Sequence, residues 1–371
     1  MKVECTTLCS YCICHHKEQT LPLIPTDDFH SRVSASPAAG MEQNLTNSCD
    51  VFEYKRAAHI TFPIFYMLVF LISLSGNSLV LYITFQQKQK FKSTSLYLAN
   101  LAISDALFTL ALPGRIVYYI LEFNWPFGDI LCRLTAVLFY SNTYAGIAFM
   151  SCISVDRYVA MVHPQSWLGL RRTRTVRCVC VLVWAVVILE TSPLLFKNLL
   201  MKSQGRLTCM EYFNFDSSQA FPYMILFACV VGYCVPLALI LVCYTRINLK
   251  LSRTAKTTTM IGRSGRSDRA KSVIFVILFT FVLCFSPYHI NLMQFMIRKL
   301  LSASSCDDLK SFKMSLQITV SLMNLNCCLD PVIYFFAIKT YKKRVMSFFK
   351  TYMSTSAASS KSMQDNSSSN T

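Results

Sequence analysis

The chain alternates between long apolar runs and short polar connections. Seven runs are long enough to cross the roughly 30 Å hydrocarbon core of a bilayer as helices of about 20 residues. The strict alternation of polar and apolar residues that marks a membrane barrel is absent from them. The predicted spans are Ile60–Phe85, Ser93–Leu121, Ile130–Met161, Val176–Phe196, Phe221–Ile247, Ser272–Ile297 and Phe312–Phe336. The pattern therefore predicts an all-α membrane protein, a seven-transmembrane helix bundle.

The basic residues indicate the orientation of this bundle. The chain has 36 Lys and Arg residues against 19 Asp and Glu, a formal net charge of +17. The connections on one side of the predicted membrane hold 20 of the basic residues, and those on the other side hold 7. Because Lys and Arg concentrate in cytoplasmic loops, we expect the N-terminus outside and the C-terminus in the cytoplasm of a multi-pass plasma-membrane protein. Membrane topology then accounts for the net positive charge, which therefore does not indicate a nucleic-acid partner.

This topology predicts four parts of the chain. Residues 1–57 form an extracellular tail, in which Asn44 opens an Asn-Leu-Thr sequon for glycosylation. Residues 58–337 form the seven-transmembrane domain, and residues 338–350 form a short amphipathic cytoplasmic helix. Residues 351–371 are Ser-rich with few large apolar side chains, which predicts a disordered cytoplasmic tail with many hydroxyls for phosphorylation.

Two pairs of cysteines lie on the predicted outer side, where disulfides form. Cys132 opens the third span and Cys209 lies in the longest outer loop, so a bridge between them would hold that loop over the bundle. Cys49 and Cys306 are a second candidate pair. The N-terminal cysteines match no standard zinc-finger spacing, so no metal site is predicted there.

Polar side chains in the middle of the predicted membrane are expensive and by default functional. Asp105 lies about 18 Å into the second span, near mid-membrane. Asn77, Asn326 and Asp330 lie in other spans at depths that allow them to converge on it. Two interpretations remain open: a sodium-binding cluster that differs between two conformations of the bundle, and a static set of interhelical hydrogen bonds.

Asp156, Arg157 and Tyr158 end the third span at the predicted cytoplasmic edge. An adjacent carboxylate can restrain an arginine, so the motif is a candidate latch that releases a cationic donor to a cytoplasmic partner. A static ion pair at the membrane interface is the alternative.

A second group of polar residues points to a ligand cavity near the outer end. Arg115 follows a proline in the second span, Tyr140, Asn142 and Tyr144 lie in the third, and Tyr288 lies in the sixth. One cation, several phenols and apolar walls suit a large apolar ligand with a few hydroxyls or one acid group. A snorkelling arginine and interfacial tyrosines are the alternative.

The chain carries no catalytic motif on which an enzyme could be argued. A P-loop, a dinucleotide-binding Gly motif, a His-Glu-x-x-His motif and a Gly-x-Ser-x-Gly motif are all missing. No cofactor is expected apart from an allosteric sodium ion at Asp105. Seven spans without internal symmetry also argue against a transporter.

Ordered motifs on the seven spans resemble those of rhodopsin-like G-protein-coupled receptors over about Cys49–Lys350. They are Gly76-Asn77, Leu101 with Asp105, Cys132, Asp156-Arg157-Tyr158, Trp184, Pro236 with Tyr244, Phe281-x-x-Cys284-x-x-Pro287 and Asp330-Pro331-x-x-Tyr334. The resemblance implies that Arg157 meets the G protein, while Asn77, Asp105, Asn326 and Asp330 form the sodium and switching network. Asp156, Tyr158, Tyr244, Pro287 and Tyr334 are the coupling and switch residues that it implies.

Within this family, four stretches of the chain are similar to the oxysterol receptors of immune cells. The stretches are Leu112–Ile116, Phe139–Gly146, Thr208–Tyr212 and Cys284–His289. The similarity implies a hydroxylated sterol as ligand, coupling to an inhibitory-class G protein, a role in cell migration, and arrestin and receptor kinases acting on the tail. A lysophospholipid or other acidic lipid is the alternative ligand. A nucleotide is disfavoured, because one arginine cannot neutralise a diphosphate.

Overall fold

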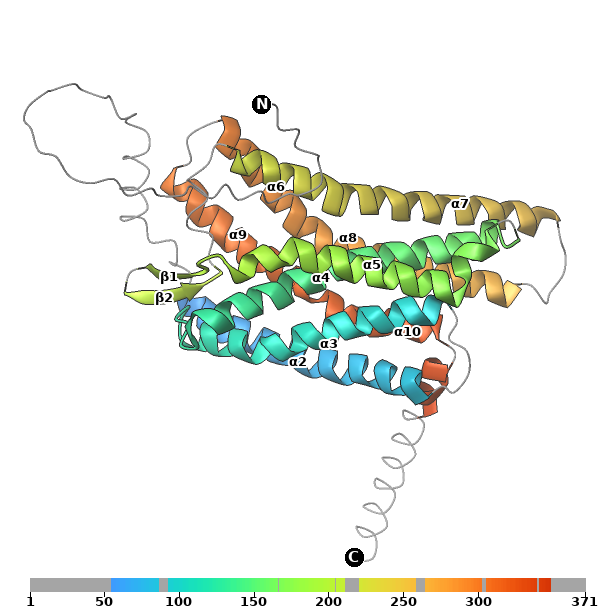
Figure 1. The fold of residues 1–371 in the computed structure, drawn as a ribbon, viewed down its shortest axis with the longest axis horizontal. Coiled ribbons are helices and arrows are strands. Elements are labelled where there is room, and N and C mark those ends of the chain that lie inside the picture. Colours follow the sequence, from blue (N-terminus) through green and yellow to red (C-terminus); the bar gives the residue numbers. More distant parts are fainter. Residues whose placement is uncertain are drawn as a thin grey trace, which may run out of the picture.

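The computed structural model describes residues 55–86, 93–165, 167–203, 205–210, 220–257, 264–301, 305–338 and 340–347. Seven helical segments in these ranges are long and apolar enough to cross a membrane. They lie alongside one another as one elongated bundle (Figure 1). The segments are α2 (Lys55–Gln86), α3 (Ser93–Ile120), α4 (Gly128–Val162), α5 (Thr173–Thr191) with η2 (Ser192–Leu195), α6 (Phe221–Cys229) with η3 (Val230–Cys234) and α7 (Val235–Thr257), α8 (Ser264–Leu301), and α9 (Cys306–Asn324) with α10 (Asn326–Ala337).

The seven-helix prediction is confirmed, but several helices extend beyond the predicted spans. The first helix begins at Lys55, the fifth span continues to Thr257, and the sixth begins at Ser264. The apolar runs mark only the part of a helix that fits hydrocarbon. Lys and Arg favour helix, so the fifth and sixth helices continue through the basic sequence that borders the predicted cytoplasmic face. On the opposite side, the first helix begins with Lys55 and Arg56.

Many large apolar side chains point outward from the bundle. Leu110 is 70% exposed, Val181 68% and Phe85 70%. A soluble protein rarely exposes a contiguous apolar surface of this kind, whereas a lipid bilayer covers it.

The loop between the fourth and fifth spans contains a β-hairpin that the sequence did not predict. Strand β1 (Leu200–Ser203) pairs antiparallel with β2 (Arg206–Cys209), with Met201 opposite Thr208. The turn includes Gly205 at φ 77°, a conformation that glycine adopts without steric cost. The backbone nitrogen of Trp125 donates to the Leu207 carbonyl across 2.7 Å, which joins the hairpin to the loop between α3 and α4.

The first and last spans approach each other very closely at Gly76. A Cβ atom added at this glycine would lie 2.4 Å from Cγ of Pro331 in α10. Only the missing side chain of Gly76 allows this approach, which brings Asn77 to the carbonyl of Cys327 at 3.0 Å.

Residues 340–347 are helical, within the range predicted for a short helix after the last span. Tyr341 is 4% exposed and packs against Tyr334, with ring centroids 6.2 Å apart. The Lys342 ammonium lies 5.2 Å from the Phe335 ring centroid. This helix therefore packs directly on α10.

Candidate functional site

A tight pocket, with no room for a water molecule in this conformation, lies near the end of the bundle that carries the Cys132–Cys209 disulfide, which we call the disulfide end. Helices α2, α3, α4 and α9 enclose it, together with Met210, which follows β2. The side chains that line it are Tyr66, Phe108, Leu112, Arg115, Thr135, Phe139, Met210 and Asn324. Among these described residues the wall is mainly aromatic and aliphatic, with Thr135 and Asn324 as neutral polar members and Arg115 as the charged one.

Arg115 is 8% exposed and is held by the aromatic side chains around it. Its guanidinium donates to the Tyr119 hydroxyl at 3.0 Å and lies 5.5 Å from the Tyr118 ring centroid. The Tyr119 hydroxyl in turn donates to Gln317 Oε1 on α9 at 2.9 Å. This relay positions a cation beside apolar walls, where charge-assisted hydrogen bonds are strong.

A second buried cation, Lys313, lies on α9 shortly before Gln317 in the sequence. Lys313 is 0% exposed and lies four residues, about one helical turn, before Gln317. The sequence interpretation placed a single cation in the site and did not consider Lys313, because it stands near the start of its span. Burial is the signal that identifies it.

The three predicted ligand tyrosines lie at other places in the bundle. Tyr140 packs edge-on against the lining residue Phe139, with ring centroids 5.1 Å apart. A Cβ atom added at Gly232 would lie 3.3 Å from the ring of Tyr144, so this ring faces the π-helical segment η3. Tyr288 packs edge-on against His289 at 5.1 Å. Tyr140 thus borders the cavity lining through its neighbour Phe139.

Asn142, the other predicted ligand contact in α4, bonds to the polar network in the structure. Its side-chain nitrogen donates to Asp105 Oδ1 at 2.9 Å and approaches Ser104 Oγ at 3.3 Å. The physical reason is helical periodicity. At about 100° per residue, positions 140 and 144 share a face and position 142 points the opposite way. Asn142 therefore joins the polar network.

The polar network brings together side chains that lie far apart in the sequence. The Tyr334 hydroxyl donates to Asn77 Oδ1 at 3.1 Å and to Asp105 Oδ2 at 3.4 Å. Asn77 is also bonded to the backbone of Ser73 at 3.1 Å. Asn77, Asp105 and Tyr334 are each 0% exposed. The predicted convergence of Asn77 on Asp105 is thus present, with Tyr334 as the bridge between them.

Asp330 and Asn326 complete the network at its α10 side. Asp330 is 0% exposed and interacts electrostatically with Asp105, and Asn326 is 1% exposed. Within the described part of the chain, no group donates a hydrogen bond to either carboxylate oxygen of Asp330. Two neighbouring buried carboxyl groups cannot both be ionised without a compensating charge. Their oxygens are the ligand type that a hard cation prefers, so this donor set fits a sodium ion.

At the opposite end of the bundle, which we call the Arg157 end, the structure gives Asp156 three partners. The hydroxyls of Ser93 and Thr94 donate to its two oxygens, and Arg171 Nε donates to Oδ1 at 2.9 Å. The sequence interpretation paired Asp156 with the adjacent Arg157 and missed Arg171, which lies in η1 (Leu168–Arg171) after α4. The Asp156 side chain is 3% exposed and the Arg171 side chain 30% exposed, so the pair is half-buried.

Tyr158 and Tyr244 meet at the Arg157 end in one apolar cluster. Both pack against the buried side chains of Ile247, Leu251 and Ile274. These residues come from α4, α7 and α8, so the cluster closes that end of the bundle. Pro287 lies inside α8 closer to the disulfide end.

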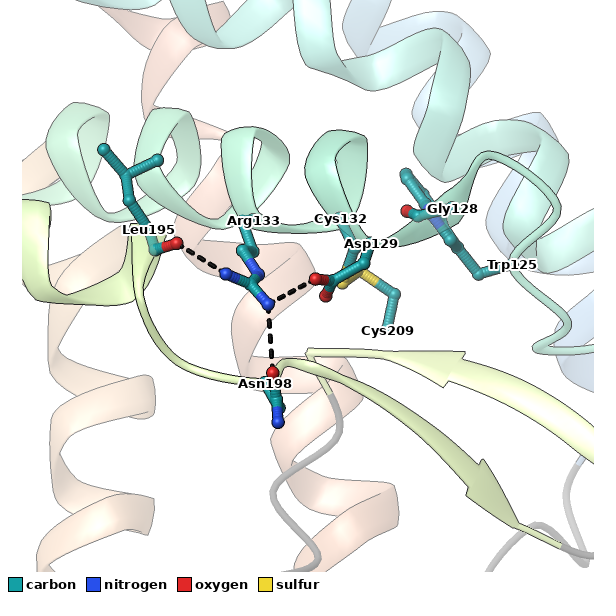
Figure 2. A network of polar contacts seen from close by, with 8 residues as sticks. All are labelled: Trp125, Gly128, Asp129, Cys132, Arg133, Leu195, Asn198 and Cys209. Atoms are coloured by element: carbon teal, nitrogen blue, oxygen red, sulfur yellow. Dashed lines mark hydrogen bonds and ion pairs between the residues drawn. A yellow bond between two sulfur atoms is a disulfide. The ribbon is translucent and has the colours of Figure 1, made fainter.

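The disulfide end is held by a network that Figure 2 shows. Cys132 and Cys209 form the predicted disulfide, with their Cα atoms 5.7 Å apart. Arg133, which the sequence interpretation did not single out, forms an ion pair with Asp129. It also donates to the Leu195 carbonyl at 2.8 Å and to Asn198 Oδ1 at 2.9 Å. Arg133 thereby fixes the segment before the hairpin to α4, next to the disulfide.

Three sequence predictions fall wholly or partly outside the described residues. Cys306 is disulfide-bonded, but Cys49, its predicted partner, lies outside the described ranges. The predicted glycosylation site Asn44 and the tail 351–371 also lie outside them.

Seven apolar helices around a buried carboxylate network, closed at one end by a disulfide-linked loop, define a seven-transmembrane receptor. The family model described as "7 transmembrane receptor (rhodopsin family)" matches residues 76–334. The chain belongs to this family. It is a multi-pass receptor of the plasma membrane, and its family acts through G proteins.

Curated relatives match most of the chain. The protein named G-protein coupled receptor 183 from Rattus norvegicus is 48% identical over 315 residues, which cover 84% of this chain and 88% of that protein. The protein of the same name from Homo sapiens is 47% identical over 315 residues, which cover 84% of this chain and 87% of that protein. Lysophosphatidic acid receptor 6 from Gallus gallus is 36% identical over 282 residues, or 74% of this chain and 89% of that protein.

Proposed function

We propose that the chain is a receptor for a hydroxylated sterol, which binds at the Arg115 cavity. The observation that carries the proposal is the composition of the pocket wall, where Arg115 stands among mainly aromatic and aliphatic side chains, with Thr135 and Asn324 as neutral polar neighbours. Such a wall favours a large apolar ligand with a small number of oxygen atoms. The similarity of the chain to the oxysterol receptors of immune cells supports the same ligand class and a role in directing cell migration.

The proposal is tested with Arg115→Ala in cells that carry a cyclic-nucleotide reporter. We expect the potency of a hydroxylated sterol to fall at least tenfold, because a charge-assisted hydrogen bond contributes about 1.5–3 kcal/mol. The matched control is Lys202→Ala, which removes an exposed cation from the hairpin. Unchanged sterol potency in Arg115→Ala, with surface expression equal to that of the control, would refute the assignment.

An acidic lipid is the second candidate ligand, and Lys313 is the observation that favours it. This lysine is buried one helical turn before Gln317, the residue that accepts from Tyr119, so a second buried cation lies on the helix that ends the Arg115 relay. The relative named lysophosphatidic acid receptor 6 points to the same chemistry. Parallel challenge with lysophosphatidate and with the sterol separates the two candidates: a response to lysophosphatidate alone, lost in Lys313→Ala, favours the acidic lipid.

We also propose that signalling proceeds through an inhibitory-class G protein that contacts Arg157. Its approach requires the separation of α7 and α8 at the Tyr158–Tyr244 cluster, with α8 bending at Pro287. Agonist should therefore lower cyclic AMP, and Arg157→Ala should abolish this response while agonist binding remains. Receptor kinases and arrestin are the proposed partners of the tail 351–371.

Sodium is the proposed allosteric ion of the polar network. Asp105 and Asp330 would hold it, with Asn77 and Asn326 as neighbouring polar groups. The ion would supply the positive charge that two adjacent buried carboxylates need. A ligand that favours a conformation without this site would then bind more weakly as sodium rises.

A further inference from the structure

The connection between α4 and α5 carries an apolar patch at the Arg157 end of the bundle. Its side chains are Trp167, which is 48% exposed, and Leu168 and Leu170 of η1, which are 59% and 45% exposed. This end lies opposite the β-hairpin (Figure 1). A contiguous exposed patch of this kind marks a surface that contacts a membrane or another protein. None of its residues lines the Arg115 cavity.

The patch lies beside the start of a membrane span. The candidate span begins at Thr173, the first residue of α5. The Thr175 hydroxyl donates to the Gly169 carbonyl at 3.0 Å, which holds η1 against the first turn of α5. The patch is therefore close to the level at which α5 enters the predicted membrane.

The exposed face of α5 changes from basic to apolar along the helix. Arg174 and Arg177 are exposed. Val181 and Leu182, about one turn further, are 68% and 63% exposed. At about 1.5 Å per residue, Val181 lies roughly 6 Å beyond Arg177 along the helix axis. Since the aliphatic side chains face the lipid tails, the two arginines lie at the depth of the lipid headgroups.

The basic side chains of this surface lack acidic neighbours in the sequence. Residues 157–189 contain five arginines and no Asp or Glu. One of the five, Arg171, pairs with Asp156 at 2.9 Å. Arg172, Arg174 and Arg177 form no ion pair within the described part of the chain. At the predicted cytoplasmic face, these three cations meet the membrane leaflet that carries anionic lipids.

Trp167 is held in place by an aromatic row. Its ring stacks on His163 with centroids 5.9 Å apart, and His163 packs edge-on against Tyr158 at 5.6 Å. Tyr158 in turn belongs to the apolar cluster that closes the Arg157 end. A side chain fixed in this way loses little conformational entropy on binding. The headgroup region of a bilayer favours tryptophan, so Trp167 is prepared to enter it.

The arrangement favours a phosphorylated lipid over a soluble anion. Each guanidinium can bind phosphate oxygens through two parallel N–H donors. Three exposed arginines within residues 172–177 match a headgroup that carries several phosphates. A soluble phosphate would leave Trp167, Leu168 and Leu170 in water, whereas a lipid in a membrane places apolar groups beside them.

From these observations we propose that η1 and the first turns of α5 form a docking surface for a phosphoinositide of the cytoplasmic leaflet. The three exposed arginines bind the phosphates of the headgroup, and the apolar patch inserts among the neighbouring lipids. The surface is separate from the Arg115 cavity and does not depend on which ligand that cavity takes.

The test uses the full-length receptor in phosphatidylcholine nanodiscs, without a G protein or an agonist. The discs contain a phosphatidylinositol bisphosphate with a photoreactive group on its headgroup, and labelled residues are located by mass spectrometry. Because the discs offer this lipid on both faces, the result does not depend on the orientation of the receptor in the cell. We expect labelling of η1 and the first turns of α5. The unlabelled lipid should compete more strongly than phosphatidylserine or soluble inositol trisphosphate.

Two variants remove the two parts of the surface. Arg172→Gln, Arg174→Gln and Arg177→Gln combined should reduce this labelling about a hundredfold at low lipid content, because each basic side chain near an anionic surface contributes about fivefold. Trp167→Gln should reduce it about tenfold, because a large apolar side chain no longer enters the interface. All four positions are exposed, so the fold should tolerate both variants.

The matched control combines Lys342→Gln, Lys343→Gln and Arg344→Gln, which removes the same charge from exposed residues after α10. It should leave the labelling of η1 nearly unchanged. Equal surface expression of the variants shows that each is folded.

Three results would overturn the proposal. The first is an unlabelled η1 in the wild-type receptor, and if Trp167→Gln then impaired G-protein activation, the patch would belong to the G protein. The second is an arginine variant that loses no more labelling than the control, since overall charge would then explain the binding. The third is competition by soluble inositol trisphosphate as strong as that by the lipid, since the arginines would then bind phosphate without the membrane.

Discussion

The side-chain nitrogen of Asn142 donates to Asp105 Oδ1 across 2.9 Å and so joins α4 to α3 inside the bundle. Both residues are at most 3% exposed. We expect Asn142→Leu to lower the free energy of unfolding by about 1–3 kcal/mol, because Asp105 then loses a buried donor. Thermal denaturation of the purified receptor measures the change. Agonist affinity should stay within a factor of three. A large loss of agonist affinity without a loss of stability would instead indicate that Asn142 contacts the ligand.

The paired carboxylates predict a stabilising effect of sodium. The melting temperature of the receptor should rise when NaCl replaces choline chloride at equal ionic strength, because the ion binds the folded bundle. Asp330→Asn removes one of the two buried charges and should abolish the difference. Asp307→Asn, an exposed carboxylate at the start of α9, is the matched control. If Asp330→Asn kept the full sodium effect, the ion would have to bind elsewhere.

The contact between Gly76 and Pro331 predicts a steric effect. Gly76→Ala places a methyl group 2.4 Å from the Pro331 ring, so α2 and α10 must separate. Overpacking of this kind costs about 1–3 kcal/mol. Gly169→Ala, where no atom lies within 4 Å of the added Cβ, should have little effect. Surface expression and melting temperature measure both variants, and equal values would show that the helices adjust freely.

The Asp156–Arg171 pair predicts a change in basal signalling. If this half-buried pair holds the Arg157 end closed, Arg171→Ala should raise agonist-independent signalling, since a buried carboxylate would lose its charged partner. The exposed Lys343 is the control, and Lys343→Ala should leave the basal level unchanged. A basal level in Arg171→Ala equal to that of the wild type, at equal expression, would identify the pair as static.

The relay from Arg115 through Tyr119 to Gln317 predicts an intermediate effect of Tyr119→Phe. This variant keeps the ring beneath the guanidinium but removes the hydroxyl that bonds both neighbours. A neutral hydrogen bond contributes about 1 kcal/mol, so agonist potency should fall about fivefold, less than for Arg115→Ala. A loss equal to that of Arg115→Ala would mean that the hydroxyl itself contacts the ligand.

Residue patterns predicted the helices because a bilayer demands a long apolar run for each crossing. They also predicted the Cys132–Cys209 disulfide and the meeting of Asn77 with Asp105, since topology placed each pair at a common depth. They did not predict the β-hairpin, whose strands are four residues each and mix polar with apolar side chains. Such short strands carry too weak a periodicity to distinguish them from a loop.

The partners of individual side chains were harder to predict. Arg171 lies 15 residues from Asp156 along the chain and reaches it only because η1 turns back toward α4. Lys313 was overlooked because composition does not report burial. Asn142 was predicted as a ligand contact together with Tyr140 and Tyr144, and the sequence already placed its helical phase opposite theirs.

The docking of Tyr341 on Tyr334 links the last short helix to the centre of the receptor. Tyr334 touches Asn77 and Asp105 with its hydroxyl and Tyr341 with its ring. A fluorophore attached to residues 342–347 would thus report on the state of the buried acids Asp105 and Asp330. Its emission would change when these acids bind or release a proton or an ion. This change would be measurable in the receptor alone, without an effector protein.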